Sequence, residues 1–249
     1  RDKVMRITGL VAVVLAMVFA MPSRAESNIS VSMTALEFTG VIQQNGKGAF
    51  DYFLRDLEQL AQVSHAYTVV PTARGAKDFF AHKSECIVPS SLYPPYFEKH
   101  DVIHSESFAS VRYIAFTLAD QAAIISKKQM AGKVIGVIRD EDAWDYEKRF
   151  SIPGATYIRV SNLESLVEML YKERIDVAIH DHSDFLLMVQ HLKRPAVNFN
   201  LDYPLAVDRV VISCHNSPKT RAYLARINPH IKSMVEKGLG KYYQMASIE

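Results

Sequence analysis

Hydrophobic and polar positions in the first part of the chain alternate between the period of a strand and the period of a helix. Short apolar or β-branched runs predict strands at 28–33, 66–71 and 85–89. Apolar residues every three or four positions predict helices at 48–62 and 73–82. The apolar face of the first helix consists of Phe50, Phe53, Leu54, Leu57, Leu60 and Ala61. This order predicts an α/β fold in which helices cover the faces of a parallel sheet.

A second series of the same kind begins near residue 112. The pattern predicts strands at 112–118, 133–138, 156–160, 176–180 and 208–214, and helices at 142–150 and 162–173. Ser161 or Asn162 could cap the second of these helices. The end of the chain predicts two helices with a break at Asn228–Pro229, because proline cannot continue the helical hydrogen-bond ladder.

The start of the chain has the layout of a secretory leader. Basic residues precede a run of twelve apolar residues, Leu10–Met21, and a small-residue segment that ends at Ala25 follows it. A membrane anchor is the alternative, but a spanning helix needs about 20 apolar residues. We therefore predict residues 1–25 to be a signal peptide cleaved after Ala25, with Met5 as the initiator and the periplasm as the destination.

Removal of that leader changes the charge of the protein. The whole chain has a net charge of +2, and residues 1–25 contain four basic residues and one acid, so the remainder carries −1. The remainder therefore has no basic excess of the kind that would indicate nucleic-acid binding. The remaining chain is long enough for one large domain or two lobes. In an oxidising compartment Cys86 and Cys214 could form a disulfide or could remain two buried thiols, and the sequence leaves both open.

Asp181 is the most informative polar residue, because it directly follows the apolar strand predicted at 176–180. Ligands of α/β sheets bind outside the carboxyl ends of the strands, so Asp181 is a candidate ligand residue, with a helix cap as the alternative. A metal site with His180 and His182 lacks further ligands at a suitable spacing. We expect no metal, no other cofactor and no catalytic role, since Asp181 has no identifiable catalytic partner.

Several segments together resemble one family. The segments GAFDYFLRDLEQLA, ARGAKDFFAHKSECIVP, MAGKVIGVIRDEDAW, LVEMLYKERIDVAIHD and MVEKGLGKYYQM occur in the order found in family 3 bacterial extracellular solute-binding proteins, the periplasmic receptors of amino acid transporters. The resemblance implies a two-lobed clamshell of the type 2 periplasmic-binding topology. Lobe 1 would comprise 26–110 and 203–249, lobe 2 would comprise 111–202, and hinges would lie near 109–112 and 199–206. In that topology Cys86 and Cys214 are neighbours.

The resemblance also implies a ligand site. Asp181 matches the aspartate that binds the ligand's ammonium, and Ser90 and Ser91 match a hydroxyl run after the third strand. Where the family carries an arginine for the ligand's carboxylate, this chain has Tyr96 and Phe97, which cannot replace a guanidinium fork. Further candidates are Arg74, a possible anion partner or a surface residue; Phe38, a stacking aromatic or a core residue; and Asp140, Glu141 and Asp142, ligand contacts or helix caps.

These features predict a receptor for a small polar solute. The acidic residues favour an amine-bearing ligand, and the partner would be a membrane permease of the ABC type. A periplasmic sensor that signals to a membrane protein is one alternative. A dehydratase-like enzyme on the same fold is another, which the absent arginine disfavours. We expect a monomer that binds no nucleic acid.

Overall fold

The computed structural model describes residues 28–38, 40–93, 97, 99–138 and 149–247. The predicted signal peptide therefore lies outside the described residues, as do Tyr96, Asp140, Glu141 and Asp142. No helix of the described ranges is both long enough and apolar enough to cross a membrane.

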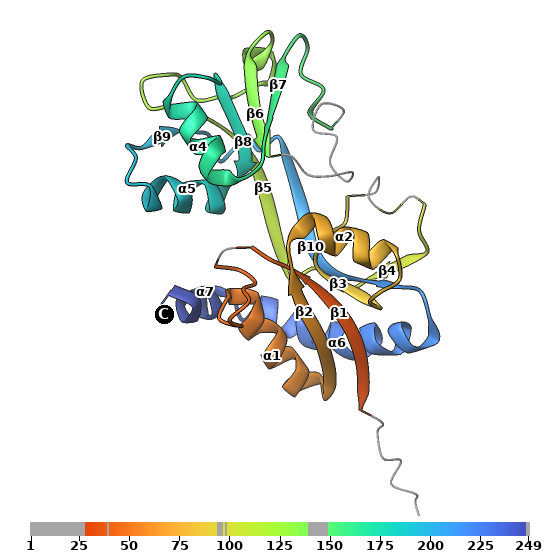
Figure 1. Cartoon of the computed structure of the whole chain (residues 1–249). Coiled ribbons are helices and arrows are strands. Elements are labelled where there is room, and N and C mark those ends of the chain that lie inside the picture. Colours follow the sequence, from red (N-terminus) through yellow and green to blue (C-terminus); the bar gives the residue numbers. More distant parts are fainter. Residues whose placement is uncertain (1–27, 39, 94–96, 98, 139–148, 248–249) are drawn as a thin grey trace, which may run out of the picture.

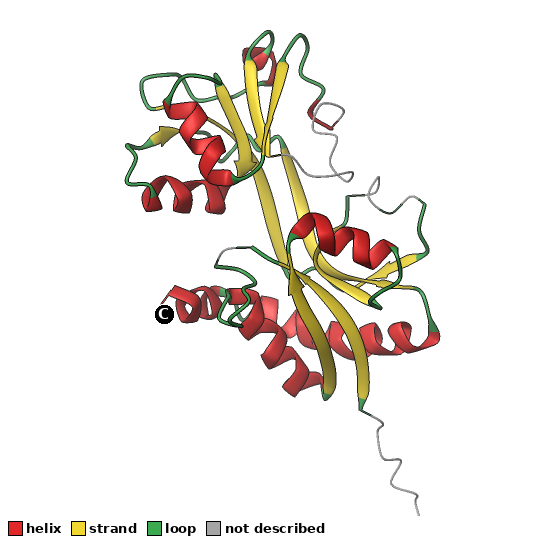
Figure 2. Ribbon diagram, viewed as in Figure 1, coloured by secondary structure: helices red, strands yellow, loops and turns green. Residues whose placement is uncertain are grey.

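Strands and helices follow one another largely in the predicted order (Figures 1 and 2). The strands are β1 (Ile29–Leu36), β2 (Val63–Val70), β3 (Cys86–Ser91), β4 (Val102–His104), β5 (Ala109–Leu118), β6 (Val134–Ile138), β7 (Thr156–Val160), β8 (Val177–Asp181), β9 (Val197–Asn198) and β10 (Ala206–His215). The helices are α1 (Ala49–Ala61), α2 (Thr72–Phe80), α4 (Leu163–Tyr171), α5 (His182–His191), α6 (Pro218–Glu236), α7 (Gly240–Ser247) and the 3-10 helix η2 (Lys127–Met130).

The strands form a sheet in the order β2-β1-β3-β10-β5-β8-β6-β7, with β4 paired to β10 and β9 paired to β5. β1 is parallel to both β2 and β3, and β6 is parallel to β7 and β8. The long strands β5 and β10 are antiparallel neighbours, and they run from one half of the molecule to the other (Figure 1). The fold is therefore a two-lobed α/β clamshell with two crossing segments.

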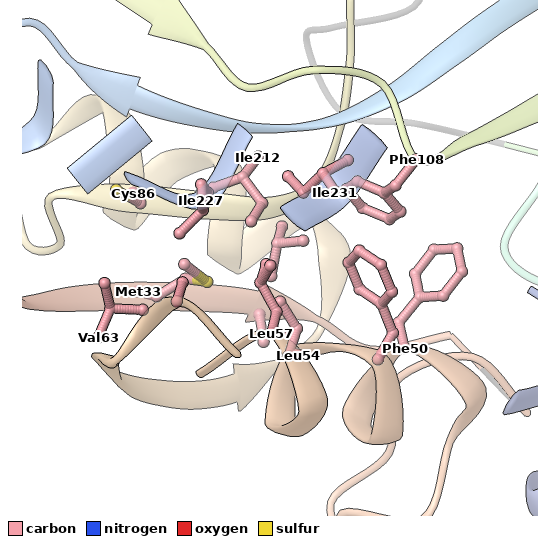
Figure 3. Close-up of a cluster of buried hydrophobic side chains, with 14 of the residues drawn as sticks. Met33, Phe50, Leu54, Leu57, Val63, Cys86, Phe108, Ile212, Ile227 and Ile231 are labelled. Atoms are coloured by element: carbon pink, nitrogen blue, oxygen red, sulfur yellow. The ribbon is translucent and has the colours of Figure 1, made fainter. Parts of the chain in front are cut away.

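Lobe 1 consists of β1–β4, α1, α2, α6 and α7, together with the adjoining ends of β5 and β10. Its largest hydrophobic cluster joins α1, α6 and α7 to one face of the sheet (Figure 3). Met33, Phe53, Leu57, Ile212 and Ile227 are all buried there. Because apolar residues repeat along α1 with helical spacing, one stripe of that helix supplies much of this cluster. The opposite face of the sheet packs against α2.

Lobe 2 consists of β6–β9, η2, α4 and α5, together with the other end of β5. Its sheet also has two buried faces: α4 and α5 cover one, and the segment with Met130, Phe150 and Ile152 covers the other. α4 begins at the predicted cap, since the side chain of Asn162 accepts a hydrogen bond from the backbone N–H of Ser165 at 2.8 Å.

The predicted helix break at Asn228–Pro229 is wrong. α6 continues through Pro229 to Glu236, and α7 begins only after Gly238, whose φ is 83°. Ile227 and Ile231, on either side of the proline, are fully buried against lobe 1. The burial of these two side chains outweighs the hydrogen bond that the proline nitrogen cannot donate.

Cys86 and Cys214 form a disulfide bond between β3 and β10. The two strands are antiparallel, and the register places these two residues opposite each other. This is the pairing that the resemblance implied, and it links segments 128 residues apart in the sequence.

Candidate functional site

The candidate site lies where the parallel strands of both lobes end. In Figure 1 the carboxyl ends of β1 and β8 point towards the region between the lobes. Asp181 is the last residue of β8, Ser91 is the last residue of β3, and both strands adjoin the crossing pair β5 and β10. Polar side chains at these ends can therefore meet between the lobes.

Asp181 caps α5. Its Oδ1 atom accepts hydrogen bonds from the backbone N–H groups of Ser183 at 3.0 Å and Asp184 at 3.1 Å. Its Oδ2 atom accepts one from the backbone N–H of Arg112 on β5 at 3.2 Å. The helix cap that the sequence offered as the alternative role is therefore present. A cap fixes the orientation of the carboxylate and leaves its negative charge in place.

Two titratable groups beside Asp181 have shifted pKa values. Burial, followed by the charge of Asp181, raises the pKa of Asp184 to about 7. Burial lowers the pKa of His180 to about 4, against the opposite effect of Asp181. The Nε2 atom of His180 lies 4.0 Å from Oδ2 of Asp184. At neutral pH the imidazole is neutral and Asp184 is partly protonated, so His180 does not compensate the negative charge that remains on the acids.

Tyr243 on α7 brings lobe 1 close to these acids. Partial burial, followed by the negative charges of Asp184 and Asp181, raises the pKa of the Tyr243 hydroxyl. Like any tyrosine hydroxyl, the phenol is protonated near neutral pH and can donate a hydrogen bond there.

An ion pair absent from the sequence prediction lies at the crossing strands. The guanidinium of Arg149 donates a hydrogen bond from Nη2 to Oδ1 of Asp208 on β10, and these side chains are 6% and 7% exposed. Burial raises the pKa of Asp208, whereas Arg149 and Ser91 oppose that rise. The Cζ atom of Arg149 also lies over two aromatic rings, 4.3 Å from the centroid of Tyr93 and 4.9 Å from that of Tyr113.

Strand register relates this ion pair to Asp181. Tyr113 on β5 lies opposite Asp181 on one side and opposite Ala206 on the other. Asp208 follows Ala206 by two residues, so Asp181, Tyr113 and Asp208 occupy one face of the sheet on three neighbouring strands. The two acids therefore belong to one region.

The two predicted serines lie at the end of β3. Ser91 is half-buried, and its hydroxyl accepts a hydrogen bond from the backbone N–H of Tyr93 at 3.0 Å. Ser90 is 7% exposed, and its hydroxyl has no hydrogen-bond partner among the described residues. Ser91 thus adjoins Asp208 and Tyr93 of the ion-pair region.

Arg74 and Phe38 lie elsewhere in lobe 1. The Arg74 side chain is 70% exposed on α2, and its Nε atom lies 3.4 Å from Oδ2 of Asp78. Phe38 packs against the apolar cluster of Leu36, Phe79, Ile87 and Phe97. Arg74 is thus a surface residue and Phe38 packs with core residues, which are the alternatives that the sequence left open beside a ligand contact. Phe97, which stands near the position expected for arginine, is a core residue 8% exposed.

Arg149 and Asp208 left little signal in the sequence. Asp208 opens the predicted strand at 208–214, and a charged residue at the start of a buried strand is a weak indication of an ion pair. Arg149 lies at the end of a charged segment with no distinguishing pattern. Among the described residues no group of three or more histidine, cysteine or acidic side chains could hold a metal ion.

No family model and no curated protein sequence matches the chain. Solved structures do match. The GluR0 ligand-binding core in complex with L-glutamate superposes with a TM-score of 0.69 at 11% identity, over 88% of this chain and 98% of that one. The ancestral amino acid-binding protein AncCDT-1, a precursor of cyclohexadienyl dehydratase, gives 0.65 at 16% identity, over 87% and 94%.

A histidine kinase sensor domain with similarity to periplasmic-binding proteins gives a TM-score of 0.68 at 11% identity, over 88% of this chain and 95% of that domain. The resemblance seen in the sequence is thereby confirmed at the level of the fold. The chain has the two-lobed fold of the type 2 periplasmic-binding proteins.

Proposed function

We propose that the protein is a periplasmic receptor that captures a small, polar, amine-bearing solute between its two lobes and delivers it to an ABC permease. The leader at 1–25 would direct the chain to the periplasm. The lobes would meet near 109–112 and 199–206, where β5 and β10 adjoin. In this proposal the protein binds its ligand without catalysis and works as a monomer.

The observation that carries the ligand class is the position of Asp181. A carboxylate at the carboxyl end of β8 is held by three backbone N–H groups beside the crossing strands. Asp184 follows it in the first turn of α5, and His180 beside it is neutral at neutral pH. An ammonium group placed there would gain charge-assisted hydrogen bonds. Ser90 and Ser91, at the end of β3, would be further contacts of the same solute, and Arg74, Phe38, Asp140 and Asp142 are the remaining candidates of the proposal.

Closure would follow from binding across both lobes. A solute held by Asp181 of lobe 2 and by residues of lobe 1 stabilises the closed arrangement more than the open one. The crossing strands β5 and β10 would absorb the change, as in other hinge motions.

Two alternatives each rest on a structural neighbour. The histidine kinase sensor domain favours a receptor that reports occupancy to a membrane protein rather than to a permease. The dehydratase precursor favours an enzyme, for which turnover of a cyclic acid substrate would be the decisive observation. The same ligand screen separates both alternatives from a protein that binds nothing.

The test is a melting-temperature screen of the ligand-free protein against amino acids, polyamines, other amines and small carboxylates. A ligand that binds only the folded state raises the melting temperature with its concentration. We expect amines to raise it. Asp181→Asn should weaken that binding about tenfold to a hundredfold, because the amide oxygen still caps α5 but the charge is gone.

Ser217→Ala is the matched control, since it removes the cap of α6 just beyond Cys214, which pairs with Cys86 at the start of β3, the end of that strand opposite to Ser91. That variant should be less stable by about 1 kcal/mol and should bind with unchanged affinity. A response to carboxylates alone would contradict the amine preference. No response to any compound would contradict solute capture by the isolated protein.

A further inference from the structure

The guanidinium of Arg149 is enclosed by groups from other parts of the chain. Tyr93 follows β3 in lobe 1, Tyr113 lies on β5, and Asp208 lies on β10. Arg149 itself enters from lobe 2, because the next residue, Phe150, is fully buried in the core of that lobe. The contact therefore joins a side chain of lobe 2 to a cage built by lobe 1 and the crossing strands.

The cage has the chemistry of a site for a flat cation. Aromatic faces attract a guanidinium through their negative quadrupole, and a carboxylate supplies the hydrogen-bond acceptor and the opposite charge. Ser91 keeps a hydroxyl beside Asp208 and fixes the start of the loop that carries Tyr93. Without Arg149 the cage would hold a buried carboxylate with no counter-charge, which strongly favours the entry of another cation.

We propose that Tyr93, Tyr113 and Asp208 form a guanidinium-binding site between the lobes, which Arg149 occupies as an internal ligand. The site differs from the one proposed for Asp181, although Tyr113 lies next to Asp181 in the strand pairing. A solute with a guanidinium group competes with Arg149 for the cage and releases the link between the lobes. The proposal does not depend on the amine preference, because it is tested with a different probe.

The test is chemical rescue of Arg149→Ala by methylguanidinium chloride at non-denaturing concentration. Methylguanidinium should raise the melting temperature of this variant by about 3–6 °C at ten times its dissociation constant. Methylammonium at the same concentration should give a smaller rise, since its compact charge does not match the flat cage. In the unchanged protein, whose cage is filled, and in Arg149→Ala/Asp208→Asn, which lacks the carboxylate, methylguanidinium should give no larger rise than methylammonium, which also reports any binding of an amine at Asp181.

An equal rise in the unchanged protein and in Arg149→Ala would overturn the proposal, and so would the absence of a rise in a folded Arg149→Ala. If that variant does not fold, a double-mutant cycle of Arg149→Gln and Tyr93→Leu replaces it. The cage predicts a coupling of about fivefold in the unfolding equilibrium constant, the size of one cation–π contact. Additive effects of the two substitutions would overturn the proposal.

Discussion

Asp184 and His180, the two titratable neighbours of Asp181, respond to pH in opposite senses. The pKa of Asp184 is about 7 in the folded protein, above its ordinary value, so the folded state binds more protons between pH 4 and 7. Its contribution to stability is fully present below pH 4 and is lost as the pH rises through 7. The pKa of His180 is about 4, so its contribution is present above pH 6.5 and is lost as the pH falls.

Asp184→Asn isolates the first of these effects. The amide is neutral at every pH and has nearly the same shape, so the variant should match the unchanged protein at pH 4 and exceed its stability at pH 8. Because the Asp184 side chain is 29% exposed, we expect a gain of about 1–3 kcal/mol at pH 8. Urea unfolding at both pH values measures it. A variant less stable than the unchanged protein at pH 8 would contradict the raised pKa.

The sequence predicted the position of Asp181 but not its surroundings. A strand of apolar residues that stops at an acid fixes that acid at the edge of a sheet, whatever the rest of the fold. Arg149 and Asp208 are 59 residues apart, and only the tertiary packing of Tyr93 and Tyr113 around them creates the ion pair. Local pattern carries no information about such a contact.

At the scale of elements, the longest periodic segments were the best predicted. α1 and α4 have clear apolar stripes, and their observed bounds differ from the predicted ones by one or two residues. α5 was not predicted, because only Phe185 and Val189 of its residues are buried and no continuous stripe results. α6 was split incorrectly, because a local proline rule was applied without the burial of Ile227 and Ile231.

The continuity of α6 can be tested with Pro229→Ala. In a continuous helix, alanine at position 229 supplies the backbone N–H that proline lacks, and this N–H can donate a hydrogen bond to the carbonyl of Ala225. Alanine is also the better helix former. The unfolded chain gains freedom, which offsets part of the effect. We expect a net gain of about 1–2 kcal/mol in the free energy of unfolding, measured with urea. A loss of stability would show that the proline suits a break in the helix.

At the scale of the whole molecule, the two lobes followed from the resemblance, because the length of the chain alone allowed one large domain or two lobes. Each lobe buries its own hydrophobic clusters, and β5 and β10 connect them. In the proposed function the side chains between the lobes would decide what the molecule binds, and their positions depend on how the lobes meet. The fold could therefore be predicted from pattern and resemblance, whereas the composition of the interlobe region required the structure.

In the proposed function a solute bound between the lobes draws them together. Small-angle X-ray scattering of the purified protein, with and without the amine that most raises its melting temperature, tests this most directly. We predict a smaller radius of gyration with the amine and a smaller change for Asp181→Asn at the same concentration, because that variant lacks the charge that holds the solute. An unchanged radius of gyration in the unchanged protein at saturating amine would contradict capture by closure.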